Sequence, residues 1–436
     1  MDFTLIGILG IVALLVMLFL GLHMALDFIL VGVLGLTIII NFQAAMSLLG
    51  ETLYNAIASP TFCVLPLFIL MGAFASRGGF AELAYTNVHT ICARLPGALA
   101  IATSFGCAVF ASICGSTIAT ATIFGRLAYP EMKRYNYDKS YSLGAIACSG
   151  SFACMIPPSG MFILFAIFTD QSVGKLFLAG ILPGIVTAIV YAASMYLRAK
   201  MHPKLAPIHA EERLVTPRQR VKAGFMLWPI LLLASLVIGG IYTGMFTANE
   251  AGAVGAFGAL AFGVIYGRLR KIEPIRSSLR ETASTTAMLF FIIIAAMYFS
   301  RFLTVTRIPT DLANFLASWN VHRHIVFTAV IGVWFFLGMI IYQAAVFALT
   351  LPIIFPVLVS LGYDPIWICV VAMKLNEIAG ITPPVGINAF ALAGVTDSRV
   401  EDVFKGVLPF ILCDLIVIVM LFLWPGMATF LPDHMF

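Results

Sequence analysis

Charged residues are scarce in this chain: Asp, Glu, Lys and Arg make up 10% of its 436 residues, against about 25% in soluble domains. Hydrophobic residues account for 61%, and the mean hydropathy is +1.04. This composition excludes a soluble fold, which needs far more polar surface, and it excludes disordered, collagenous and nucleic-acid-binding chains. What remains is a polytopic, all-α membrane protein.

Several motifs that would indicate an enzyme or an ATP-driven machine are also absent. The one Gly-Lys pair, Gly174-Lys175, lacks the upstream glycine of a P-loop. There is no H-E-x-x-H, and no histidine lies at mid-membrane beside a Ser or Cys, so an intramembrane hydrolase would lack its base. The eight cysteines form no C-x-x-C and read as small apolar residues. We therefore expect neither an enzyme nor a cofactor.

Apolar runs long enough to cross a bilayer, about 20 residues, recur along the chain. Residues 1–22 carry no Lys or Arg ahead of their run, which favours a first membrane span over a cleaved signal peptide. Eight single spans are predicted near 4–22, 27–42, 60–76, 172–197, 224–243, 250–267, 282–303 and 404–424. Amphipathic patterns over 80–95 and 308–319 predict two interfacial arms.

Four longer stretches are interrupted near their middles. The spans 139–169 and 364–395 are broken by Pro157-Pro158 and Pro383-Pro384. The stretches 97–129 and 322–360 are predicted to be re-entrant hairpins with tips at Cys114-Gly115-Ser116-Thr117 and Tyr342-Gln343. A pair of short full spans is the alternative for each hairpin.

The basic residues set the orientation of this arrangement. Ten crossings and two hairpins place both termini on one side of the membrane. Alternate connections hold 20 of the 25 Lys and Arg residues, and the positive-inside rule makes those connections cytoplasmic. Both termini are therefore expected outside, in the periplasm of a Gram-negative host.

The two halves of the chain repeat each other at an offset of 226 residues. Between 130–184 and 356–410 this offset gives eleven identities in 55 positions, most of them helix breakers or turn residues. Each unit holds five crossings, an odd number, so the second copy must be inverted. Inverted repeats with broken helices are typical of secondary transporters, whose substrate site lies between the halves.

The broken helices are where transport chemistry is expected. Prolines remove amide donors and leave carbonyl oxygens, which suit a small hard cation such as Na⁺. The N-termini of half-helices offer N–H groups to an anion. The only charge cluster deep in a predicted span consists of Lys374, Asn376 and Glu377. Two readings stay open: the pair neutralises itself at i, i+3, or Lys374 reaches toward an anionic substrate.

At these motifs the sequence resembles the large membrane subunit of the tripartite ATP-independent periplasmic (TRAP) transporters. The matching stretches are Gly115-Ser116-Thr117-Ile118-Ala119-Thr120-Ala121-Thr122, Pro130-Glu131-Met132-Lys133, Ile156-Pro157-Pro158-Ser159, Gly174-Lys175-Leu176-Phe177-Leu178-Ala179-Gly180-Ile181-Leu182-Pro183-Gly184 and Ile381-Thr382-Pro383-Pro384-Val385-Gly386-Ile387-Asn388. The similarity extends over essentially the whole chain. Tyr342-Gln343 departs from the family, where many members carry an acidic residue, and Lys374 is unusual.

The resemblance implies an elevator-type carrier in the bacterial inner membrane that uses Na⁺ to take up an organic acid, a carboxylate or sulfonate. It implies two partners, a small four-helix membrane subunit and a soluble periplasmic binding protein. A stand-alone Na⁺/anion symporter of related fold is the alternative. The expected division is scaffold and first arm 1–96, first transport half 97–198, cytoplasmic loop 199–223, scaffold and second arm 224–321, and second transport half 322–436.

The resemblance also implies site residues by position. A first sodium site would use carbonyls of Ala111, Ser112, Cys114, Ala153, Ile156 and Pro158, and a second those of Gly338, Ala379, Thr382 and Val385. Ser112 and Gly338 are themselves 226 residues apart, so the repeat places the two sets consistently. Substrate contacts are expected from Gly115, Ser116, Thr117, Gly160, Lys374, Gly386 and Asn388.

Overall fold

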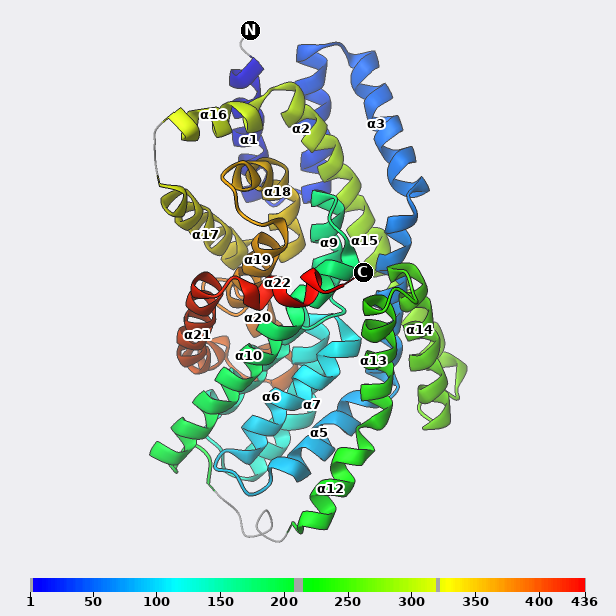
Figure 1. The fold of residues 1–436 in the computed structure, drawn as a ribbon, viewed down its shortest axis with the longest axis vertical. Coiled ribbons are helices and arrows are strands. Elements are labelled where there is room, and N and C mark those ends of the chain that lie inside the picture. Colours follow the sequence, from blue (N-terminus) through cyan, green and yellow to red (C-terminus); the bar gives the residue numbers. More distant parts are fainter. Residues whose placement is uncertain (1–2, 208–214, 319–321, 436) are drawn as a thin grey trace.

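The computed structural model describes residues 3–207, 215–318 and 322–435. All regular secondary structure in these ranges is helical. Figure 1 shows an elongated bundle with α1, α2 and α3 toward one end and α5 and α12 toward the other. The first-half helices are α1 (Phe3–Phe19), α2 (Met24–Ile39), α3 (Phe42–Ala58), η1 (Pro60–Cys63), α4 (Val64–Arg77), α5 (Phe80–Cys92), α6 (Ala98–Cys114), α7 (Thr117–Arg134), α8 (Lys139–Gly150), η2 (Ser151–Cys154), α9 (Gly160–Thr169) and α10 (Val173–Met201).

The second half has the same order of elements from its arm onward. Its helices are α12 (Pro217–Met226), α13 (Trp228–Tyr242), α14 (Ala248–Ile265), α15 (Ile272–Val305), α16 (Ile308–Ser318), α17 (Arg323–Ile340), α18 (Gln343–Ser360), α19 (Pro365–Ala379), α20 (Ile387–Thr396), α21 (Val400–Leu423) and α22 (Gly426–Asp433). The predicted helical arms correspond to α5 and α16, although Trp319 lies outside the described residues.

Corresponding elements of the two halves begin alike. α7 and α18 match the 226-residue offset at both ends. Asp138 and Asp364, also 226 apart, each cap the following helix by accepting a backbone N–H at 2.8 Å, from Tyr141 and Trp367. A side-chain oxygen at the N-cap satisfies an amide that has no partner inside the helix. The repeat found in the sequence thus carries the same local structure in both copies.

Both predicted helix breaks are confirmed. α8 and η2 are separated from α9 by a non-helical segment that contains Pro157-Pro158. Likewise, Pro383-Pro384 lies between α19 and α20. Both Pro–Pro peptide bonds are cis.

Several local expectations need correction. The sequence predicted no helix over 42–58, where α3 lies, because its polar residues such as Glu51 lower its hydropathy; Asn41 caps its start. α15 is 34 residues long and extends beyond the predicted span 282–303, since its first turns carry charges that a hydropathy argument leaves out. Asp170 and Asp397 end α9 and α20 in the left-handed conformation.

The scaffold helices pack against one another around α4 and α15. α14 packs along α4, and α15 contacts both α2 and α4. The Tyr298 hydroxyl donates to the Ala45 carbonyl at 2.9 Å and ties α15 to α3. Glu250 forms a capping box with Thr247 at the start of α14. These contacts place α4 and α15 side by side where they face the hairpins.

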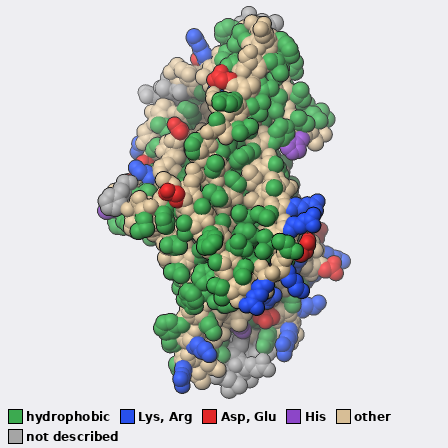
Figure 2. All heavy atoms as spheres, turned by 90° about the vertical axis from the view of Figure 1, so that its right-hand side faces the viewer, with side chains coloured by type: hydrophobic (Ala, Val, Ile, Leu, Met, Phe, Trp, Pro, Cys, Tyr) green, Lys and Arg blue, Asp and Glu red, His purple; other side chains and the backbone are tan. Residues whose placement is uncertain are grey.

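The outer surface fits a membrane environment. Seven described helices are long and apolar enough to cross a bilayer, or eight if the bent pair α12–α13 is one span. The sequence predicts ten crossings; α1, α2, α9 and α20 are apolar but shorter. Figure 2 shows hydrophobic side chains spread along one face, with Lys and Arg gathered in its lower part. So large an exposed apolar area is typical of a lipid-facing surface.

Candidate functional site

A cavity of about 130 Å³ lies where the two hairpin tips meet the scaffold. On one side it is lined by the tip of α6–α7, by the first break and the start of α9, and by Tyr342 and Gln343 at the tip of α17–α18. On the other side it is lined by α4, from Leu65 to Ser76, and by Glu281, Thr285 and Leu289 of α15. Segments far apart in the sequence therefore share one interior space.

The first hairpin tip is tightly packed on both sides. Gly115 has a φ of +65°, and a Cβ there would lie 2.8 Å from the Pro158 carbonyl oxygen. On the scaffold side, a Cβ at Gly72 of α4 would collide with the carbonyl oxygen of Cys114. Glycine removes both conflicts, because it has no side chain and tolerates positive φ. The tip thus touches the first break and the scaffold at the same time.

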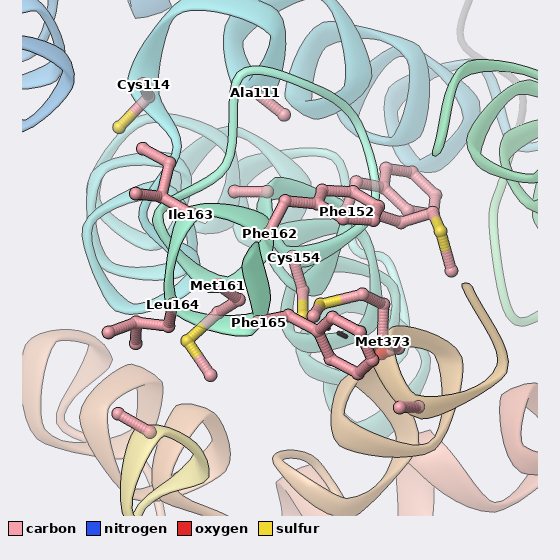
Figure 3. Close-up of a cluster of buried hydrophobic side chains, with 14 of the residues drawn as sticks. Ala111, Cys114, Phe152, Cys154, Met161, Phe162, Ile163, Leu164, Phe165 and Met373 are labelled. Atoms are coloured by element: carbon pink, nitrogen blue, oxygen red, sulfur yellow. Dashed lines mark hydrogen bonds between the residues drawn. The ribbon is translucent and has the colours of Figure 1, made fainter. Parts of the chain in front are cut away.

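The first break is enclosed by apolar side chains. The amides of Met155 and Ile156 both donate to the Phe152 carbonyl, at 2.9 and 2.7 Å, which tightens the turn after η2. Figure 3 shows Phe162 and Phe165 of α9 packed beside η2 and Cys154. This packing holds the break rigidly next to the cavity.

The second hairpin tip and the second break also meet. The Gln343 amide nitrogen donates to the Asn376 carbonyl at 2.5 Å. A Cβ at Gly338 would lie 2.7 Å from the Cβ of Ala379. The Thr382 hydroxyl donates to the Ile378 carbonyl at 2.6 Å, and its oxygen retains lone pairs that can accept or coordinate.

Three helix N-termini open onto the cavity. Thr117, Gly160 and Gln343 line it and are the first residues of α7, α9 and α18. Among the described residues that line it, Glu281 alone carries a charged side chain, and Arg77 neutralises it at 2.5 Å. The cavity therefore presents backbone dipoles and hydroxyls, with no unpaired charge, to anything that enters it.

A buried charge network lies apart from the cavity lining. Lys374 Nζ is 2.9 Å from Glu377 and 2.6 Å from Asp414, and the side chains of all three residues are fully buried. Tyr191 donates to Asp414 at 2.7 Å, and Lys374 donates to Thr187 at 3.2 Å. Of the two readings that the sequence left open, these distances show the ion pair of Lys374 with Glu377. Asp414 of α21, which the sequence prediction did not include in this cluster, joins it.

Comparison with known proteins decides the family. The family model described as "Tripartite ATP-independent periplasmic transporter, DctM component" matches residues 11–427 of this chain. The C4-dicarboxylate TRAP transporter large permease protein DctM of Pseudomonas aeruginosa is 30% identical over 400 residues, 91% of this chain and 92% of that protein. This chain belongs to the TRAP transporter large permeases. It is a multi-pass membrane component of a transport system and not an enzyme.

Other relatives of this TRAP permease are named for different solutes. The ectoine/5-hydroxyectoine permease UehC of Ruegeria pomeroyi is 28% identical over 97% of this chain and 98% of its own length. The isethionate permease protein DctMQ of Oleidesulfovibrio alaskensis is 29% identical over 87% of this chain and 59% of its own length. The YdaH transporter of Alcanivorax borkumensis shares the fold, with a TM-score of 0.62 at 15% identity over 89% of this chain and 90% of that one.

The structure brings together only some of the residues that the sequence singled out in this TRAP permease. Gly115, Ser116, Thr117 and Gly160 line the cavity, as do Cys114 and Pro158 of the expected first sodium site. The other sodium-site residues lie at the two breaks and on the hairpin arms just before the tips. The cavity lining does not include Lys374, Gly386 or Asn388.

Glu281 and Thr285 of α15 line the cavity without having been predicted. A helix contributes residues to a cavity through the fold, and no motif marks them in the sequence. Asp414, in contrast, could have been singled out from the sequence. It is an ionisable residue within an apolar run, and such a residue in a membrane span is functional by default.

Proposed function

We propose that this TRAP permease takes up a small organic acid anion in symport with Na⁺, after a soluble periplasmic binding protein delivers it. Relatives named for C4-dicarboxylates and for isethionate support an anionic solute. The chain is a component of a tripartite system by family, so the two partners are a binding protein and a small membrane subunit.

The observation that carries the proposal is the convergence of three helix N-termini on one cavity. Each N-terminus supplies the equivalent of about half a positive charge and free N–H donors. The lining has no Lys or Arg, so binding an anion there depends on dipoles and hydroxyls such as those of Ser116 and Thr117. Na⁺ ions bound at the two breaks would add the positive charge that balances a fully ionised acid in the cavity.

The two breaks are the proposed Na⁺ sites. The first comprises Ala111, Ser112, Cys114, Ala153, Ile156 and Pro158, and the second Gly338, Ala379, Thr382 and Val385. Support comes from the contacts of Gly115 with Pro158 and of Gly338 with Ala379, which bring each hairpin to its break. Carbonyl oxygens freed from helical bonding are the ligands a hard cation prefers.

An inverted repeat and an elevator movement complete the proposal. The last helix of each unit packs against the broken span of the other, α21 against α8 and α10 against α19. Such an exchange interlocks the two transport halves, 97–198 and 322–436, into one body. That body would move against the scaffold of α4 and α15, with both termini in the periplasm and the permease in the inner membrane.

Reconstitution tests the role of the binding protein. The solute that co-purifies with the binding protein is first identified by mass spectrometry. The permease and its small subunit are then placed in proteoliposomes, and uptake of that solute is measured under a fixed inward Na⁺ gradient. Uptake is expected only with the binding protein present; equal uptake without it would indicate a stand-alone symporter and contradict the proposal.

A further inference from the structure

Glu377 contacts the residue at its own equivalent position in the other repeat. The Ser151 hydroxyl, which donates to the Cys148 carbonyl at 2.6 Å, also lies 3.2 Å from Glu377 Oε1, and the two residues are 226 positions apart, the offset of the repeat. Equivalent residues of two copies can touch only where the copies face each other. Cys154 Sγ and the Met373 carbonyl, 3.7 Å apart, cross the same boundary (Figure 3).

Ser151 and Glu377 each lie a few residues before a helix break. Ser151 opens η2, which contains Ala153 and precedes Pro157-Pro158. Glu377 lies in the last turn of α19, two residues before Ala379. One buried polar contact therefore links the two segments that the proposed function assigns to Na⁺.

The Glu377 carboxylate is held from its other side. Its Oε2 pairs with Lys374 Nζ at 2.9 Å, and Lys374 is fixed by Asp414 of α21 at 2.6 Å and by Thr187 of α10 at 3.2 Å. With Oε2 held by the ammonium, Oε1 remains for Ser151. Through Lys374, the Glu377 carboxylate is tied to α10 and α21 as well as to its own helix, α19. Because packed interiors deform little, a shift of η2 then moves α19 and not the Glu377 side chain alone.

We propose that the Ser151–Glu377 contact couples the two cation sites, so that Na⁺ at one break raises the affinity of the other for Na⁺. This inference rests on the proposed Na⁺ sites. A cation at the first break fixes η2 and with it the Ser151 hydroxyl, which aligns Glu377 and the carbonyls that follow it. Coupling of this kind is reciprocal. Glu377 and Ser151 are positioning residues, as are Lys374 and Asp414 behind them.

Na⁺ titration of the purified complex of permease and small subunit tests the coupling without any solute. Tryptophan fluorescence is the readout, because Trp334 is buried in α17 four residues before Gly338. Choline chloride keeps the ionic strength constant. The wild-type complex should bind Na⁺ with a Hill coefficient above 1.

Ser151→Ala removes the contact. We expect its Hill coefficient to fall to about 1, with the half-saturating Na⁺ concentration raised about 5-fold or more and the melting temperature nearly unchanged. Ser151→Thr keeps a hydroxyl and should restore cooperativity. Ser142→Ala is the matched control, a buried serine of α8 whose hydroxyl bonds only the Asp138 carbonyl among the described residues.

Glu377→Leu removes the contact from its other side, and Lys374 keeps Asp414 as its counter-charge. It should lose cooperativity like Ser151→Ala, because an aliphatic side chain cannot hydrogen-bond with Ser151. Wild-type cooperativity that persists in both variants would overturn the coupling alone. A wild-type complex that does not respond to Na⁺ would overturn the proposed function, and the coupling with it.

Discussion

Lys374 shows what one buried charge requires of its surroundings. The sequence left two roles open for it, and the contacts favour pairing: Lys374 is fully buried and lies between Glu377 and Asp414. Spacing along one helix was enough to predict the first partner. The second partner comes from α21, and only the packing of α19 against that helix brings the two together.

Replacing Lys374 with Met should destabilise the protein strongly, because two carboxylates are left buried without a counter-charge. Breaking a buried pair from one side costs about 3–5 kcal/mol. Lys374→Met/Glu377→Gln should recover little, since Asp414 remains charged, whereas the triple variant with Asp414→Asn should recover most of the loss. Thermal unfolding in detergent measures this series. A single Lys374→Met variant that melts like the wild type would contradict the pairing role.

Thr382→Ala should weaken Na⁺ dependence more than stability. Its hydroxyl oxygen lies at the second break, so the substitution removes an oxygen that can coordinate Na⁺. The cost in stability should be small, because the hydrogen bond that this hydroxyl makes among the described residues is a local one to the Ile378 carbonyl. We expect the half-saturating Na⁺ concentration for transport to rise roughly tenfold, the factor that corresponds to about 1.4 kcal/mol.

Thr103→Ala is the control for that experiment. Thr103 is a fully buried threonine of α6 with the same kind of bond, 2.8 Å to the Leu99 carbonyl, away from both breaks. Equal effects of the two substitutions on Na⁺ half-saturation would remove Thr382 from the site.

Among the single elements, the two helix breaks and the turn between α6 and α7 were predictable because proline and glycine act locally. A Pro-Pro pair ends a helix whatever surrounds it, and Gly115 marks a turn by its backbone freedom. α3 was missed for the opposite reason: its polar residues hide a helix that tertiary packing against α2 and α15 stabilises. The cavity wall from α4 and α15 could not be predicted, since it depends on how the elements meet.

Gly72→Ala should disturb transport through the contact between α4 and the first hairpin tip. The new Cβ would overlap the Cys114 carbonyl, so the tip would have to leave its present position. Overpacking of this kind costs about 1–3 kcal/mol, which disfavours this arrangement of tip and scaffold by about fivefold or more. We expect initial uptake rates to fall accordingly, while the melting temperature changes little.

Gly50→Ala is the matched control, because no atom lies within 4 Å of a Cβ added there. If the Gly72 and Gly50 variants transport equally well, the tip does not depend on its close packing against α4.

At the scale of the whole molecule, the 226-residue offset predicted matched elements in both halves, and the helices follow it from α7 and α18 onward. The sequence did not reveal the exchange of the last helices between units, because an offset compares positions and says nothing of contacts. That exchange creates the boundary where Ser151 meets Glu377. The proposed coupling of cation sites is thus a property of the assembled repeats, and of neither repeat alone.

Transport driven by a Na⁺ gradient is the most direct test of the account. Proteoliposomes that hold the permease and its small subunit receive the solute-loaded binding protein outside, with either an inward Na⁺ gradient or choline in place of Na⁺. Solute should accumulate above the outside concentration only with the Na⁺ gradient, and the accumulation should collapse when an ionophore dissipates that gradient. Equal accumulation in choline, with no Na⁺ present, would contradict the central claim.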